Sequence, residues 1–181
     1  MMSLENKTIL ITGGARRLGR HFCLTAAQAG ANVILHHSHS PKEAEETAKE
    51  IEQYKVTCSI VTADFSNPIE TSKIMDKIFR EHSIDGLVNN AAIFDEVQFD
   101  QTSLAQWQEH LHINLTAPFL LSQLFAKYHE DKEGRIINIL DWRALRPGRD
   151  HFPYTISKAA LAAMTKSLAL TLAPNIQVNA L

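Results

Sequence analysis

Residues 8–19 read TILITGGARRLG, a short apolar run followed by a glycine-containing turn. Gly13 permits a tight turn, and Gly19 permits close packing of a helix that we expect to begin near Leu18. The free N–H groups at the start of such a helix can bind the pyrophosphate of a dinucleotide. A glycine-rich turn alone is weak evidence, but its position between a first strand and a helix favours nucleotide binding.

The rest of the chain alternates apolar strands with helical stretches. Further strands are expected at residues 32–36, 58–62, 86–89, 135–139 and 175–181, and the last two helices at 103–129 and 154–172. Ser40-Pro41-Lys42-Glu43 and Asn67-Pro68-Ile69-Glu70 each combine a capping residue, a proline and a glutamate, which predicts two helix starts. Continuous apolar strands, each followed by a helix, are typical of a parallel sheet covered on both faces.

The fold class that we predict is therefore α/β, a Rossmann-like doubly wound sheet forming one domain over residues 1–181. The final strand is apolar and is expected at a sheet edge, an arrangement that natural proteins avoid. For this reason we expect the chain to be incomplete after its sixth strand.

Composition narrows the possible partners. The chain has 181 residues, a net charge of −2 and 45% hydrophobic residues, so no basic surface indicates nucleic acid or an anionic membrane. Its apolar runs are far shorter than the roughly 18 residues that span a bilayer. Cys23 and Cys58 do not form a disulfide framework, and free thiols in a reducing cytoplasm are the simpler interpretation.

The segment His36-His37-Ser38-His39-Ser40, at the end of the second strand, indicates which nicotinamide cofactor is used. An NAD site usually has an acidic residue there, whereas this segment has none and Arg17 lies in the glycine turn. Hydroxyl, imidazole and guanidinium donors can accommodate a 2′-phosphate, which predicts NADPH. A metal site is the alternative for these histidines, but no clear fourth ligand accompanies them.

Tyr154-Thr155-Ile156-Ser157-Lys158 carries the chemistry. Side chains four residues apart share one helix face, so the phenol and the ammonium can point into one cleft. A cation about 4 Å from a phenol, at an effective dielectric constant near 20, is worth roughly 4 kcal/mol, or at most about three pKa units. Such a shift would make Tyr154 a useful general acid, although the isolated motif is common by chance.

Over essentially its whole length the chain resembles the short-chain dehydrogenase/reductase family. The motifs that carry the resemblance occur in order: Thr12-Gly13 through Gly19, Asp64, Asn89-Asn90-Ala91-Ala92, Asn114, Asp141, Tyr154 and Lys158. The resemblance implies that Asp64 contacts adenine, that the Asn-Asn-Ala turn supports the sheet and cofactor, and that Asn114 holds a proton-relay water. It also implies that Lys158 binds the nicotinamide ribose and lowers the pKa of Tyr154.

Two departures from the family pattern resemble its pteridine reductase branch. Arg17 replaces the middle glycine of the turn, and Asp141 replaces the catalytic serine thirteen residues before the tyrosine. A helix cap or a surface acid is the alternative for Asp141. Phe94 falls where that branch has an aromatic residue that sandwiches a pterin against nicotinamide; core packing is the alternative for Phe94. His39 and Ala92 differ from the branch, which often has an arginine and a hydroxyl residue there, and this weakens the substrate assignment more than the cofactor assignment.

These observations define the expected site. The expected cofactor contacts are Gly13, Arg16, Arg17, Leu18, Gly19, His37, Ser38, His39, Ser40, Asp64, Phe65, Asn90, Ala91, Ala92 and Lys158. The expected catalytic residues are Tyr154, Lys158, Asp141 and Asn114, and the expected substrate contacts are Arg17, Phe94, Asp141 and Tyr154, with no metal.

The leading interpretation is an NADPH-dependent reductase that transfers hydride to a pterin or a similar C=N heterocycle, with Tyr154 as general acid. A reductase of ordinary ketones and a non-catalytic NADP-binding protein are the alternatives. The helix over residues 103–129 carries more apolar side chains than one sheet face needs, and the family pairs this helix across a two-fold axis. We therefore expect a homo-oligomer, a tetramer or a dimer; a fully buried helix within one chain is the alternative.

Overall fold

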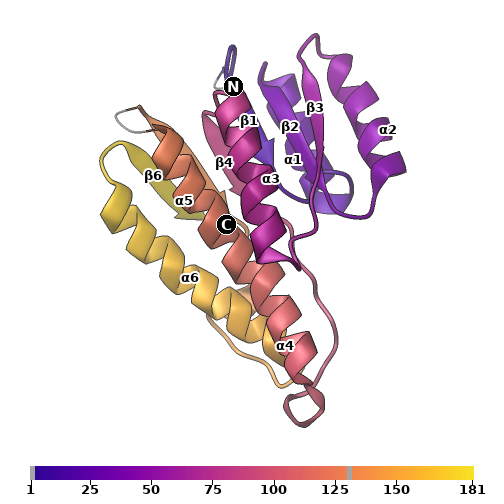
Figure 1. The fold of residues 1–181 in the computed structure, drawn as a ribbon, viewed down its shortest axis with the longest axis vertical. Helices are drawn as coiled ribbons and strands as arrows, with labels where there is room; N and C mark the ends of the chain where they lie inside the picture. Colours follow the sequence, from indigo (N-terminus) through magenta and orange to yellow (C-terminus); the bar gives the residue numbers. More distant parts are fainter. Residues whose placement is uncertain (1–2, 130–131) are drawn as a thin grey trace.

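The computed structural model describes residues 3–129 and 132–181, and these form a parallel sheet of six strands (Figure 1). The strands are β1 (Thr8–Ile11), β2 (Asn32–His37), β3 (Cys58–Thr62), β4 (Gly86–Asn89), β5 (Gly134–Asn138) and β6 (Ile176–Ala180). Their order in the sheet is β3-β2-β1-β4-β5-β6. The order reverses between β1 and β4, and ligands of open α/β sheets bind at this switch point, beyond the carboxyl ends of the strands.

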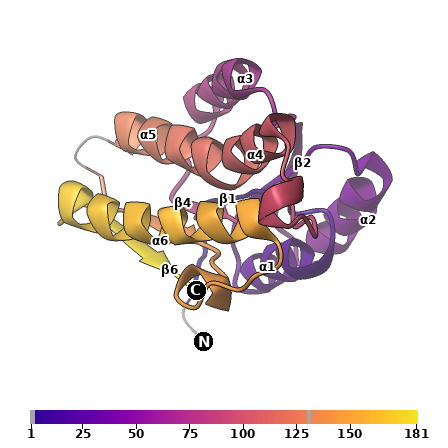
Figure 2. The ribbon, with the colours of Figure 1, turned by 90° about the horizontal axis from the view of Figure 1, so that it is seen from below.

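Helices cover both faces of the sheet. They are α1 (Arg17–Gln28), α2 (Pro41–Glu52), α3 (Pro68–Glu81), α4 (Leu104–Leu111), α5 (Ala117–His129) and α6 (Phe152–Leu172). In Figure 2, α1 and α2 lie on one side of the strands, and α3, α4, α5 and α6 lie on the other. The predicted doubly wound α/β class is confirmed.

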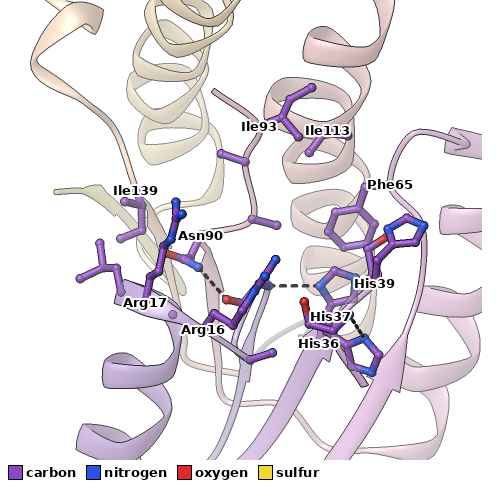
Figure 3. A pocket seen from close by; sticks show the side chains of 18 of the residues that line it. Arg16, Arg17, His36, His37, His39, Phe65, Asn90, Ile93, Ile113 and Ile139 are labelled. Carbon is purple, nitrogen blue, oxygen red and sulfur yellow. Dashed lines mark hydrogen bonds between the residues drawn. The ribbon is translucent and has the colours of Figure 1, made fainter. Parts of the chain in front are cut away.

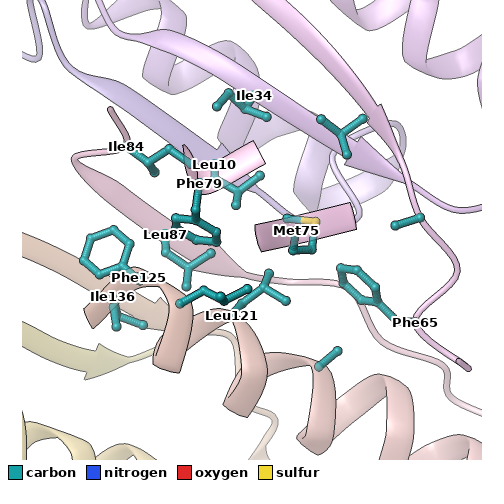
Figure 4. Packing of buried hydrophobic residues seen from close by; sticks show 14 of the residues in the cluster. Leu10, Ile34, Phe65, Met75, Phe79, Ile84, Leu87, Leu121, Phe125 and Ile136 are labelled. Carbon is teal, nitrogen blue, oxygen red and sulfur yellow. The ribbon is translucent and has the colours of Figure 1, made fainter. Parts of the chain in front are cut away.

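The larger apolar core lies between the sheet and the helices α3 and α5 (Figure 4). Leu10, Leu87 and Ile136 from neighbouring strands are buried there against Met75 and Phe125 from the helices. Burying a large apolar side chain contributes about 1.5–3 kcal/mol, so this layer fixes the strands whose ends carry the site. A second cluster, around Ile11, Cys23 and Leu35, packs α1 against the opposite face.

The two predicted helix starts were only partly correct in their capping. Asn67 caps α3, because its side chain accepts a hydrogen bond from the Glu70 N–H. Ser40 precedes α2 as expected, but its side chain forms no cap bond, so the predicted reciprocal cap with Glu43 is wrong. The Ser40 N–H instead donates to His37 Nδ1, 3.4 Å away, and this contact depends on the fold of β2.

The long helix expected at 103–129 is interrupted. A π-helical segment, His112–Thr116, joins α4 to α5, and it contains the predicted catalytic residue Asn114. Single-turn π insertions occur often at functional sites. Among the described residues, no helix is long and apolar enough to cross a membrane.

Candidate active site

A cavity of about 700 Å³ opens at the carboxyl ends of the central strands (Figure 3). Every residue predicted to contact the cofactor lines it, and so do Asp141, Tyr154 and Lys158. In Figure 3, Arg17 lies beside Asn90 and Ile139 on one side, and the histidines of the β2 end lie with Phe65 on the other. The fold therefore brings the predicted nucleotide and catalytic residues around one space.

The glycine turn has the predicted geometry. Gly13 has a φ of +64°, and a Cβ on Gly19 would lie 2.0 Å from the Gly13 carbonyl oxygen, so both positions require glycine. Arg17 also has a positive φ, +50°, a conformation usual for the glycine that it replaces. No side chain caps α1 and its first turn has no acidic residue, so its N–H groups fit an anionic pyrophosphate.

The end of β2 and the loop after it offer hydrogen-bond donors to the cavity. Several of these side chains are also hydrogen-bonded within the protein. Ser38 and His39 are hydrogen-bonded to each other, Oγ to Nδ1, at 2.7 Å. His37 is buried and lines the cavity, but its ring is also engaged by the Ser40 N–H and by Thr62 Oγ1, 3.1 Å from its Nε2, so it connects the loop after β2 to β3. Arg16 lies 3.8 Å from Glu43, which leaves Arg17 as the arginine of the turn without a carboxylate partner among the described residues.

His36 also lines the cavity, although it is not among the predicted cofactor contacts. Its ring is buried, stacks on Phe65 at 4.0 Å, accepts a hydrogen bond from the Gly13 N–H and contacts the Ala63 carbonyl oxygen through Nε2 at 3.0 Å. Burial lowers the pKa of His36 to about 4, so the imidazole is neutral. Because β2 also carries the polar residues Asn32 and His37, its sequence pattern does not single out His36.

The pKa of His36 predicts a pH dependence of stability. The unfolded chain binds this proton near pH 6.5 and the folded chain only near pH 4, so the unfolded state binds more protons between these values. The stabilisation is complete above pH 6.5 and falls by about 3 kcal/mol as the pH decreases to 4. Denaturant unfolding across this range should show a slope that His36→Asn removes; an unchanged slope would contradict the assignment.

Hydrogen bonds from the loop after β4 fix the position of the glycine turn. Asn90 Nδ2 donates to the carbonyl oxygens of Thr12 and Gly13 at 2.8 and 3.2 Å, and Thr12 Oγ1 accepts from the Ala91 N–H. Asp64 accepts a hydrogen bond from the Ser66 N–H, and this bond lowers the pKa of the Asp64 carboxyl. The turn after β1 and the loop after β4 are thus connected by hydrogen bonds as well as by the sheet, while the Asp64 bond shapes the loop after β3.

The catalytic pair has the predicted proximity but not the predicted titration. Lys158 Nζ lies 5.7 Å from the centre of the Tyr154 ring and donates to the Ile139 carbonyl oxygen at 2.6 Å. The expectation that Lys158 lowers the Tyr154 pKa is wrong for this structure: burial and the adjacent Asp141 carboxylate raise that pKa to about 12. Burial also lowers the pKa of Lys158 to about 8, which weakens its effect as a cation.

Asn114, in the π-helical segment, is completely buried. Its side chain accepts from the Ile93 N–H at 2.9 Å and donates to the Ile93 carbonyl oxygen and to Ser157 Oγ. These three bonds hold the loop after β4 against α6. They also engage both polar atoms of the amide, so the Asn114 side chain stabilises this packing. Its predicted role in holding a relay water stays a prediction.

Phe94 does not pack in the core, so that alternative is wrong: half of its surface is exposed. Its ring stacks on His151 at 3.7 Å and meets Tyr154 edge to face at 4.5 Å. Arg143 lies over the same ring at 5.3 Å and donates to Asp150 at 2.7 Å. Phe94 therefore borders the tyrosine outside the described cavity lining, with one face already covered by His151.

Arg143, Asp150 and His151 are site residues that sequence reasoning missed. Asp141 accepts a hydrogen bond from the Arg143 N–H at 2.8 Å and so caps the short 3-10 helix Trp142–Ala144. The contacts of Arg143 and His151 depend on the loop between this helix and α6, in which His151 has a φ of +48°. No motif in the sequence marks these residues.

The fold, the glycine turn and the cavity define a dinucleotide-binding protein of Rossmann type. The family model described as short chain dehydrogenase matches residues 7–181, and the chain belongs to this family of oxidoreductases. The 3-oxoacyl-(acyl-carrier-protein) reductase FabG of Aquifex aeolicus is 36% identical over 99% of this chain and 73% of its own length.

Two solved structures extend the comparison. A putative NAD(P) dependent gluconate 5-dehydrogenase from Beutenbergia cavernae, with bound NADP, has a TM-score of 0.93 and 30% identity, covering 98% of this chain and 72% of the other. FolM alternative dihydrofolate reductase 1 from Brucella canis, complexed with NADP, has a TM-score of 0.87 and 35% identity, covering 97% and 72%. The chain thus spans about three quarters of each of these relatives.

Proposed function

We propose that the chain is an NADPH-dependent reductase of a pterin or a similar C=N heterocycle. The observation that carries this proposal is the Asp141 carboxylate beside the Tyr154 phenol, both lining the cavity that the glycine turn also lines. An ionised carboxylate only accepts hydrogen bonds, which suits a heterocycle that presents N–H groups. The likeness to a solved alternative dihydrofolate reductase supports the same substrate class.

Different residues around the cavity bind the cofactor and supply the proton. NADPH bound in the cavity supplies the hydride. The α1 N-terminus, Arg17 and the Ser38–His39 loop hold its phosphates, while Lys158 holds the ribose next to the reacting atoms. With a pKa of about 12, Tyr154 is protonated at neutral pH, as an unshifted phenol would also be, and it donates this proton from Oη to the reduced substrate. The raised pKa makes the phenol a weaker acid than the sequence predicts.

Reduction of an ordinary ketone is the second candidate, favoured by the 36% identity to a 3-oxoacyl reductase. Tyr154 can donate to a ketone oxygen, but a carboxylate at position 141 adds no second donor, as a serine hydroxyl would. Assays of dihydropterin, dihydrofolate and simple ketones with NADPH separate the two. Turnover of the heterocycles alone would support the proposal, and turnover of ketones alone would overturn it.

Cofactor preference is expected to be clear. NADPH should bind at least about tenfold more tightly than NADH, because charged hydrogen bonds to the 2′-phosphate are each worth about 1.5–3 kcal/mol. Arg17→Ala should remove most of this difference when dissociation constants are measured at moderate salt. Arg20→Ala is the matched control, since Arg20 pairs with Glu50 outside the cavity. Equal affinities of the wild type for both cofactors would contradict the assignment.

We also propose that the protein is a homo-oligomer, a dimer or a tetramer, in the cytoplasm. Leu121, Leu124 and Phe125 of α5 are buried within the chain, but Phe119 is 45% exposed on the same helix. Light scattering at micromolar concentration should give a mass well above 20.3 kDa.

A substitution at Phe119 tests whether α5 forms the interface between copies of the chain. Phe119→Glu should shift the assembly toward monomer, because it introduces a charge into an apolar contact. Tyr54→Glu is the matched control, since Tyr54 is equally exposed after α2 on the opposite side of the sheet. A wild-type monomer would contradict the proposal.

A further inference from the structure

The imidazole of His36 connects the ends of three strands. It belongs to β2, accepts a hydrogen bond through Nδ1 from the Gly13 N–H of the turn after β1, and contacts Ala63 after β3 through Nε2. The donor–acceptor distances are 3.2 and 3.0 Å. The ring also stacks on Phe65, with an angle of 5° between the planes.

These partners specify one form of the ring. The Ala63 oxygen can only accept, so Nε2 carries the proton, and Nδ1 must be unprotonated to accept from Gly13. A protonated imidazole would present two donors and lose the bond to Gly13. The buried, neutral state described above agrees with this requirement.

The Gly13 peptide is held on both sides. His36 takes its N–H, and Asn90 Nδ2 donates to its carbonyl oxygen at 3.2 Å. That oxygen is also the atom that leaves no room for a Cβ on Gly19 at the start of α1. A displacement of the Gly13 peptide would therefore move the helix end that faces the cavity.

We infer that His36 is a positioning residue for the nucleotide site, holding the Gly13 turn in the shape that receives the pyrophosphate. The inference rests on the proposed NADPH cofactor. His36 acts through Gly13, because both of its ring nitrogens are engaged and Phe65 covers one face. It also follows that the Gly13 N–H is directed into the protein, so the N–H groups of α1 are the turn's donors to the phosphates.

Three substitutions separate the two contacts of the ring. The carbonyl of an asparagine can occupy the place of Nδ1, so His36→Asn keeps an acceptor for Gly13 and loses the bond to Ala63. The amide of a glutamine reaches as far as Nε2, so His36→Gln keeps the donor to Ala63 and loses the acceptor. His36→Phe keeps a ring against Phe65 and loses both bonds.

Affinity for NADPH is measured by titration at a temperature where every variant is folded. The dissociation constant should rise about 10- to 100-fold in His36→Gln and His36→Phe, because the Gly13 peptide loses its acceptor and no longer holds the turn in the shape that receives the pyrophosphate. His36→Asn should stay within about threefold of the wild type. A structural role alone would instead make the loss of affinity follow the loss of thermal stability in all three variants.

His129→Phe is the matched control. His129 is also buried, stacks on Phe125 at 3.7 Å and contacts the Phe125 carbonyl oxygen, but it does not line the nucleotide cavity. This variant should lose stability and keep the wild-type dissociation constant for NADPH. It shows what the loss of a buried histidine does by itself.

Hydrogen exchange of the Gly13 amide gives a readout that needs no cofactor. The amide should be protected in the wild type and in His36→Asn, and should exchange faster in the other two variants. Normal NADPH binding by His36→Phe, or an unprotected Gly13 amide in the wild type, would overturn the role of His36. Failure of the wild type to bind NADPH would instead overturn the proposed cofactor.

Discussion

Tyr154→Phe is expected to reduce reductase turnover by roughly 10²–10⁴-fold, the usual effect of removing a positioned general acid. The phenol is the protonated group next to the Asp141 carboxylate, and with a pKa of about 12 it is protonated across the physiological range. The substitution preserves the ring that meets Phe94 edge to face. Affinity for NADPH, measured by titration, should change by less than about twofold, because the hydroxyl does not hold the phosphates.

Tyr128→Phe is the control for this change. The Tyr128 hydroxyl of α5 donates to Asp76 of α3 at 2.9 Å, and neither residue lines the nucleotide cavity. Its loss should leave turnover at the wild-type value. If Tyr154→Phe also retains wild-type turnover, another group supplies the proton and the proposed role of Tyr154 is wrong.

Local patterns were sufficient to predict the parts of the site that depend on neighbouring residues in the chain. Gly13 and Gly19 could be assigned because a strand, a turn and a helix follow one another there, and the structure gives both glycines steric reasons. The strand ends could be assigned because their apolar runs end where polar residues begin. Since parallel strands end at one edge of the sheet, the strand pattern predicts which edge carries the site. The contacts of Asp64 and Asn90, and the roles of Lys158 and Asn114, came from the family resemblance.

Properties that depend on distant contacts could not be predicted in this way. The spacing of Tyr154 and Lys158 gives their proximity, but the sign of the Tyr154 pKa shift depends on burial and on Asp141, which belongs to another segment. Likewise, the position of Phe94 in the sequence does not reveal that His151 stacks on its ring. His36 was missed because a histidine in a strand acquires its meaning only when Gly13 and Ala63 are brought to it.

Contacts between distant segments also change which residues are expected to recognise the substrate. Phe94 was expected to stack on a pterin, and stacking now requires a ring face that His151 does not cover. Asp141 is better placed than Phe94 to discriminate between substrates, because it lines the cavity and its carboxylate raises the pKa of Tyr154. The carboxylate both opposes ionisation of the phenol and offers an acceptor to the substrate.

Asp141→Ser therefore discriminates between the two candidate reactions. Serine can accept a hydrogen bond from the Arg143 N–H, as Asp141 does now, so the short helix after β5 should keep its cap. Pterin turnover should fall by roughly 10²–10⁴-fold because the acceptor for the heterocycle N–H loses its charge. The NADPH dissociation constant and the melting temperature should both stay close to the wild-type values.

Asp141→Asn sharpens the interpretation, because it preserves size and the cap acceptor while it removes the charge. It should lower pterin turnover as Asp141→Ser does, and it should also lower the pKa of Tyr154 by removing a neighbouring negative charge. An ordinary ketone needs a donor at this position, so a serine here would favour ketones. If Asp141→Ser leaves pterin reduction intact and raises turnover of simple ketones, the carboxylate is incidental and the chain is a general carbonyl reductase.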